Sequence, residues 1–144
     1  MMNLDDAISI TEYQTLAEFR YQLRRFLRFS EQAARAAGLE PQQHQLLLAL
    51  MGLPEGKKAT IGTLAERLQL AHHSTVELVD RLVERGFIQR SRDEADQRKV
   101  LVTLTPQGEE VLRNLSLSHR DELLSIGPAL VQALNSILNN TNNT

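Results

Sequence analysis

Residues 60–104 read TIGTLAERLQLAHHSTVELVDRLVERGFIQRSRDEADQRKVLVTL, and this stretch decides the fold. Its first part predicts a short helix, because apolar residues recur at helical spacing. They are Ile61, Leu64, Ala65 and Leu68. Thr60 precedes them and suits the N-cap, since its hydroxyl can accept a hydrogen bond from a free amide at the helix start.

A second short helix is predicted after a turn at Leu70. Its apolar side is formed by Thr75, Val76, Val79, Leu82 and Val83. A rotation of about 100° per residue leaves a polar side facing outward. That side holds His73, Glu77, Asp80, Arg81 and Glu84, with Ser74 at its edge. Gly86 follows the last turn, where a left-handed residue commonly ends a helix.

Two strands at residues 87–92 and 99–104 are predicted next, joined by a charged tip. The tip, residues 92–99, is too polar to be packed and has basic residues on both shoulders. Two short helices followed by such a hairpin form the pattern of a winged helix-turn-helix. That module lays its second helix in the major groove of DNA.

The segment LAHHSTVELVDRLVERGFIQRSRDEADQRKVLVTLTPQG, residues 70–108, resembles the DNA-binding core of the MarR family of bacterial transcriptional regulators. The matching features are the STVxLVDRLxxRG helix, the wing-tip residues Asp96 and Arg98, and the LTPQG step from strand to helix. The resemblance extends over nearly the whole chain. Glu77 and the His-His pair depart from the commoner choices of the family.

This resemblance implies a mainly α fold with a small two-stranded β-wing. The winged helix-turn-helix region would span residues 41–104, flanked by dimerisation helices at 10–37 and 106–138. Within the last helical region, Gly127-Pro128 is expected to break the helix, so that a separate helix covers Ala129–Leu138. Residues 139–144 are low in complexity and are expected to be disordered.

Composition favours one domain over residues 1–144, because 42% hydrophobic residues can build a sizeable core. No apolar run approaches the length of a membrane span, and the N-terminus MMNLDDAIS lacks a signal-peptide core. We therefore expect a cytoplasmic protein that does not engage a membrane. The chain has no cysteine, which excludes disulfides, thiolate metal sites and thiol-based peroxide sensing.

Charge is distributed unevenly along the chain, although the net value is −2. Residues 57–100 carry nine basic and seven acidic groups, so the basic excess lies on the winged-helix segment. Because that excess is small, DNA affinity is expected to depend on a few placed arginines and on dimerisation.

The candidate DNA contacts lie on the second helix and on the wing. They are His72, His73, Ser74, Thr75, Glu77, Arg81, Arg90, Arg92, Arg98 and Lys99. Helix capping alone would account equally well for Ser74 or Thr75. The resemblance implies that Arg98 enters a minor groove, with Asp80 and Asp96 orienting wing arginines. Lys57 and Lys58 are interpreted as a solvated loop, with a phosphate contact as the alternative.

Neither a metal site nor a catalytic site is indicated. Adjacent histidines on a helix diverge by about 100°, so His72 and His73 do not suit one ion. No nucleophile elbow, phosphate-binding loop or zinc-protease motif is present. We expect no cofactor and no enzymatic activity.

The sequence thus predicts a double-stranded DNA-binding transcriptional regulator. By resemblance it is a ligand-responsive repressor that binds a pseudo-palindromic operator as a homodimer. The effector implied by the family is a small anionic aromatic molecule, for which Arg24, Arg28 and His44 are the candidate contacts. For the arginines of the first helix, a solvated face is the plainer interpretation. The alternative function is a winged-helix protein-interaction module that does not bind DNA.

Overall fold

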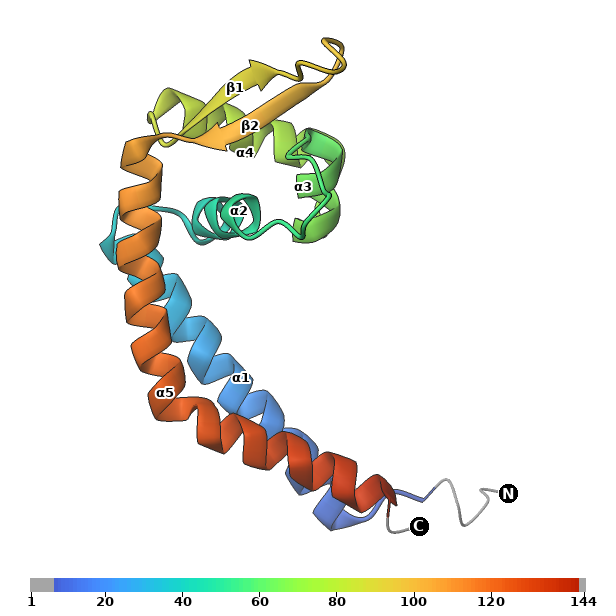
Figure 1. The fold of residues 1–144 in the computed structure, drawn as a ribbon. Helices are drawn as coiled ribbons and strands as arrows, with labels where there is room; N and C mark the ends of the chain where they lie inside the picture. Colours follow the sequence, from blue (N-terminus) through green and yellow to red (C-terminus); the bar gives the residue numbers. More distant parts are fainter. Residues whose placement is uncertain (1–6, 143–144) are drawn as a thin grey trace. The chain divides into compact units, whose positions relative to one another are not determined.

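The computed structural model describes residues 7–142, with side chains up to residue 139 (Figure 1). The elements follow the order α1 (Ile10–Ala36), α2 (Pro41–Met51), α3 (Ile61–Leu68), α4 (His72–Glu84), β1 (Ile88–Arg92), β2 (Val100–Leu104) and α5 (Pro106–Asn142). The predicted fold class, mainly helical with a two-stranded wing, is confirmed. The chain divides into two compact units. We call residues 33–117 the head, and the described residues up to 32 together with those from 118 onward the terminal unit.

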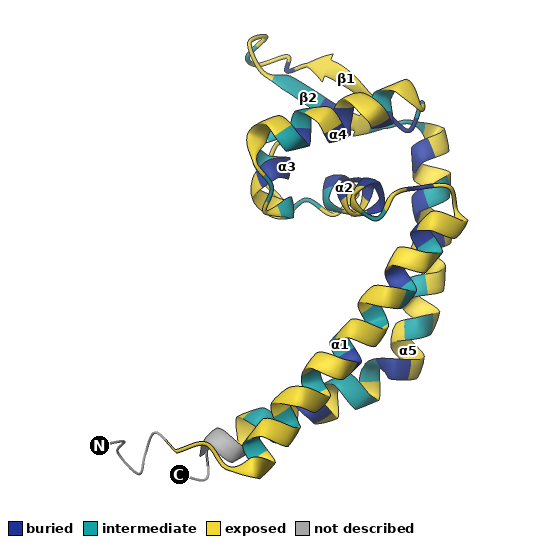
Figure 2. Cartoon of the chain, turned by 180° about the vertical axis from the view of Figure 1, so that it is seen from behind, coloured by how far each residue is buried: buried dark blue, intermediate teal, exposed yellow. Residues whose placement is uncertain are grey.

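The core of the head is built where α2, α3, α4 and the wing contact one another. The helix predicted from LLLALM supplies Leu46, Leu47 and Leu50 to this core. The second predicted helix supplies Val79 and Leu82, together with Leu78, which the helical pattern had not included. Burial of one face of each helix leaves the opposite faces in solvent, as Figure 2 shows for α4.

Threonine caps fix two helix starts in the head. Thr60 Oγ1 accepts a hydrogen bond from the backbone amide of Thr63 at 3.1 Å, so the predicted N-cap is confirmed. Thr105 Oγ1 accepts from the amide of Gly108 at 3.1 Å and donates to the carbonyl of Gly86 at 2.6 Å. The second threonine therefore joins the start of α5 to the end of α4.

The antiparallel wing pairs Ile88 with Leu104 and Arg92 with Val100. Its second strand is also bonded to the segment before α3, because the amide of Val102 donates to the carbonyl of Ala59 at 3.0 Å. The hairpin is thus attached to the head through both its core face and its outer strand.

The C-terminal helix differs from the sequence expectation. α5 continues through Gly127 and Pro128 to Asn142, so the predicted break is wrong. A proline removes one intrahelical bond at a cost of about 3 kcal/mol. The buried side chains of Ile126 and Ala133, on either side of it, keep the helix in place. Residues 139–142 of the predicted disordered tail are helical, and the last two residues lie outside the described part.

In the terminal unit, α1 and α5 lie side by side (Figures 1 and 2). The buried Ser30 hydroxyl lies 2.7 Å from His119 Nε2, and the imidazole meets the rings of Phe26 and Phe29 edge-on at 6.0 and 5.4 Å. Many large apolar side chains of this unit nevertheless remain exposed. They include Ile10, Tyr13, Leu16, Tyr21, Leu27, Leu123, Leu124, Val131, Leu134 and Leu138.

Among residues 7–142, no helix combines the length and the apolar character that crossing a lipid bilayer requires.

The tightest approach in the head yields a stability prediction. A Cβ added at Gly108 would lie 2.0 Å from the carbonyl oxygen of Phe87. The replacement Gly108→Ala should therefore lower the free energy of unfolding by about 3 kcal/mol or more, because backbone must move. Urea denaturation followed by circular dichroism measures the loss.

Gly62→Ala is the matched control, since a Cβ there meets Thr60 Oγ1 at an ordinary 3.9 Å. Alanine is the better helix former, so this variant should be neutral or more stable by up to about 1 kcal/mol. Equal stability of the two variants would refute the close approach at Gly108.

Candidate nucleic-acid interface

The outward side of α4 is polar and open to solvent (Figure 2). Of the residues proposed as DNA contacts on this helix, four are exposed, and Ser74 is half-buried. The exposed four are His72, His73, Glu77 and Arg81. This face offers donors, acceptors and the three acids Glu77, Asp80 and Glu84 without a covering element in the described head.

The N-terminus of α4 carries no side-chain cap. Ala71 occupies the N-cap position, so the hypothesis that Ser74 or Thr75 caps the helix is wrong. Thr75 is fully buried, and its hydroxyl donates to the carbonyl of Ala71 at 3.0 Å. Its side chain is part of the core, and we remove it from the set of DNA contacts. The uncapped amides of the first turn remain available to an anion.

An ion pair joins α4 to the root of the wing. Strand alternation puts Arg90 on the same face of β1 as the buried Ile88, which is the face toward α4. The Arg90 guanidinium meets the carboxylate of Asp80 there, although both side chains keep contact with solvent. Asp80 therefore orients a wing arginine, and the arginine it orients is Arg90 at the root.

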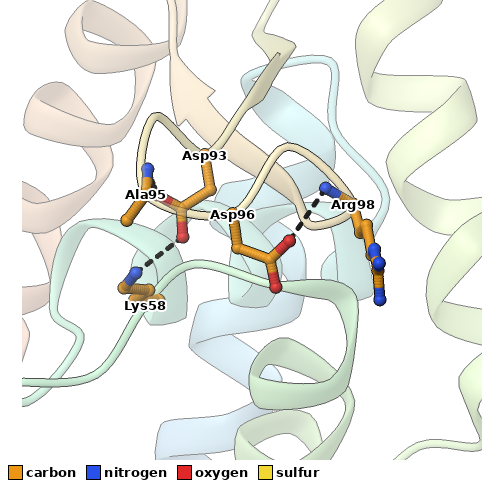
Figure 3. A network of polar contacts seen from close by, with 5 residues as sticks. All are labelled: Lys58, Asp93, Ala95, Asp96 and Arg98. Atoms are coloured by element: carbon orange, nitrogen blue, oxygen red, sulfur yellow. Dashed lines mark hydrogen bonds and ion pairs between the residues drawn. The ribbon is translucent and has the colours of Figure 1, made fainter.

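The wing tip is a closed turn (Figure 3). Asp96 Oδ1 accepts from the backbone amide of Arg98 at 3.1 Å, and the carbonyl of Asp96 accepts from the amide of Lys99 at 2.9 Å. The Asp96 carboxylate thus holds the backbone of Arg98, whereas the Arg98 guanidinium extends away from it into solvent. Arg92 donates to the carbonyl of Gln97 at 3.2 Å, which closes the same turn.

The tip is less solvated than the sequence suggests, because Asp93 is buried. Lys58 Nζ donates to Asp93 Oδ2 at 2.6 Å, and the amide of Ala95 donates to Asp93 Oδ1 at 3.0 Å. The Lys58 bond first, and then the Ala95 amide, hold the pKa of the Asp93 carboxyl below its ordinary value of 3.8. Sequence reasoning missed this pair, since 35 residues separate its members and no local pattern links them.

The candidate effector residues do not form one described site. Arg24 and Arg28 are exposed on α1 in the terminal unit, whereas His44 is buried in α2 of the head with Nδ1 3.3 Å from the Gln45 amide nitrogen. In the part of the chain that the structure describes, no three His, Asp or Glu side chains gather as metal ligands.

Two cavities offer room for a small molecule. One of about 410 Å³ lies between α1 and α5 in the terminal unit, where Glu18 is the charged residue in a lining of hydroxyls, amides and alanines. The other, of about 300 Å³, lies between α2 and α3, where Arg67 and Gln45 adjoin Leu48 and Leu68. Neither is lined by Arg24, Arg28 or His44.

Most of the head matches a known protein family. Residues 37–99 match the family model described as the MarR family. The uncharacterized HTH-type transcriptional regulator YsmB of Bacillus subtilis is 34% identical over 77 residues, which is 54% of this chain and 52% of YsmB. The chain spans between a third and about half of the length of the first curated relatives it matches.

Solved structures resemble the chain over most of its length. A mutant of MarR from E. coli, complexed with operator DNA, has a TM-score of 0.66 at 20% identity and aligns over 85% of this chain and 89% of that one. The PcaV transcriptional regulator of Streptomyces coelicolor, in complex with its natural ligand, has a TM-score of 0.59 at 27% identity over 84% and 88%. These similarities agree in fold with the arrangement of helices and wing described above.

The Asp93 carboxylate should make the head sensitive to acid. Its pKa is depressed in the folded chain, so its contribution to stability is complete above the unfolded value of 3.8 and is lost as pH falls through the folded value. We expect the urea midpoint of the unsubstituted chain to fall more steeply than that of Asp93→Asn once the pH drops below about 4, where the unfolded carboxyl begins to be protonated.

Glu94→Gln removes an exposed carboxylate of the same tip and serves as the control, which should follow the unsubstituted chain. If the Asp93→Asn curve ran parallel to that of the unsubstituted chain, the ion pair would have no part in acid stability.

Proposed function

Since this chain belongs to the MarR family of winged helix-turn-helix transcriptional regulators, we propose that it binds double-stranded DNA as a homodimer and controls transcription from a pseudo-palindromic operator. One observation carries the proposal. An α4 with an exposed polar face and an uncapped N-terminus occurs together with a wing in which the backbone of Arg98 is fixed and its guanidinium is exposed to solvent. The family is one of regulators, and we assign the chain no catalysis.

The proposed contacts divide by their chemistry. The first-turn amides of α4 with His72 and His73 meet phosphate or base edges, and Glu77 accepts from a cytosine amino group. Arg81, Arg92 and Lys99 are the phosphate partners, while Arg90 shares its charge with Asp80 and contributes less. Arg98 enters the minor groove, where a narrow groove concentrates negative potential.

Dimerisation is supported by the apolar surface of the terminal unit. Its exposed large apolar side chains lie on both α1 and α5. Leu124, for example, keeps 73% of its surface in solvent. Apolar surface on this scale marks a protein interface. A second copy that covers it would supply the second α4, and two copies of α4 would read half-sites about one helical turn apart.

Control of repression by a small anionic aromatic effector is the finer part of the proposal and rests on the family. Such a ligand would act by favouring one separation of the two heads over another. PcaV is a relative by fold whose structure holds a natural ligand. Of the two cavities described above, the one between α2 and α3 has the charge that suits an anion, because Arg67 lines it.

Arg98→Ala tests DNA binding. We expect the affinity for a labelled mixed-sequence duplex to fall by more than about ten-fold while the sedimentation of the dimer stays unchanged, because the substitution removes an exposed cation from the wing only. Fluorescence anisotropy over a range of salt concentrations gives both the affinity and its salt dependence.

The same titration separates the alternative function. Contacts to phosphates require the logarithm of the association constant to fall steeply with the logarithm of the salt concentration. A flat response, with Arg98→Ala equal to the unsubstituted chain, would favour a winged helix that binds protein and not DNA.

Leu124→Glu tests the dimer. A carboxylate in place of a leucine that is 73% exposed in the single chain should dissociate the dimer, because its partner would have to bury the charge. Leu48→Glu, on α2 of the head, is the matched control at 45% exposure. Analytical ultracentrifugation measures both, and a dimer unaffected by Leu124→Glu would refute this face as the interface.

A further inference from the structure

The wing tip is tied to the segment that precedes α3. We call this segment, residues 57–60, the anchor segment. Its Lys58 forms the ion pair with Asp93 (Figure 3). The carbonyl of the neighbouring Ala59 accepts the amide of Val102 on β2. The Lys58 side chain is 51% exposed, whereas that of Asp93 is 8% exposed. The pair is therefore an inward contact of the tip and is screened less than a surface pair.

Asp93 connects this anchor to the turn that carries Arg98. Its carboxylate accepts from the amide of Ala95, and its own amide donates to the carbonyl of Lys99 at 3.1 Å. The amides of Arg98 and Lys99 donate in turn to Asp96. Hydrogen bonds thus connect Asp93 to Lys99, Lys99 to Asp96, and Asp96 to Arg98.

The position of Lys58 gives it two different ways to affect DNA binding. As a free cation it would bind a phosphate directly, which is the role that a basic loop beside a helix-turn-helix suggests. The structure places a buried carboxylate against it, so its charge is balanced within the head. Its neighbour Lys57 is exposed and has no ion pair in the described part of the chain.

We propose that Lys58 and Asp93 are positioning residues for Arg98, so that Lys58 supports DNA binding through the wing and not through a phosphate. This inference rests on the proposed function. A tip that is already ordered avoids the entropy cost of ordering on DNA, and loss of that order is expected to weaken binding by about ten-fold.

A double-mutant cycle tests the proposal. Lys58→Met and Asp93→Asn are each measured with Arg98 present and with Arg98→Ala, on a fluorescein-labelled 40-base-pair duplex of mixed sequence. Each substitution should weaken binding by about ten-fold when Arg98 is present and by less than about two-fold when it is absent, because its effect passes through that arginine.

Two further variants separate positioning from charge. Lys58→Arg keeps a cation beside Asp93 and should restore binding to within about three-fold of the unsubstituted chain. Lys57→Met removes the neighbouring charge. Its effect on binding should be the same with Arg98 present and with Arg98→Ala. Lys58→Met could instead weaken binding equally with Arg98 present and with Arg98→Ala, and lower the slope of the logarithm of the association constant against the logarithm of the salt concentration by about 0.9. That result would identify a direct phosphate contact and overturn the proposal.

Limited trypsin digestion gives a readout that does not need DNA. Lys58→Met should speed cleavage after Arg98 and Lys99 by several-fold, more than the accompanying fall in the thermal midpoint of circular dichroism accounts for, because the tip loosens locally. If Lys58→Met left either the cleavage rate or the DNA affinity unchanged, the positioning role would be overturned. If the unsubstituted chain failed to bind the duplex, the proposed function would fall first, and the role in DNA binding with it.

Discussion

The close packing of the start of α5 against Phe87, shortly after the end of α4, constrains the rest of the head. The carbonyl of Phe87 accepts the amide of Thr105 at 3.0 Å and leaves no space for a side chain at Gly108. The amide of Phe87 donates to the carbonyl of Leu82 at 3.1 Å, and Gly86 takes a positive φ of 79°. The end of α4, the root of the wing and the beginning of α5 therefore meet at one point, and none can rotate without breaking the contacts of the other two.

This junction explains why α4 presents only its polar side. With Phe87 and Ile88 buried shortly after the helix, Leu82 and Val79 must face inward, and the residues between them face solvent. The buried Thr75 hydroxyl satisfies itself within the helix by donating to a carbonyl of the previous turn. The first-turn amides then have no side chain of their own as a cap, which is the arrangement that an anion can use.

Periodicity and caps predicted the local elements well, because a single stretch of sequence determines them. Thr60 begins a helix as expected, and the wing strands lie within one residue of their predicted bounds. The sequence failed where distant residues decide: Pro128 continues a helix, because packing compensates the lost bond. Likewise the partner of Asp93 lies 35 residues away, so no short motif could reveal that the tip is partly buried.

The ion pairs of the head also limit how it can hold DNA. Of the nine basic side chains in residues 57–100, Lys58 and Arg90 are bound to acids of the head itself. A cation that is already paired releases fewer counterions from DNA, since binding a phosphate would require it to leave its carboxylate. Under the proposed function, each head would then contribute few full phosphate contacts, and its affinity alone would be low. In the proposed dimer, two heads joined through the apolar faces of α1 and α5 would double those contacts within one association step, so the terminal unit would be as necessary to DNA binding as the wing.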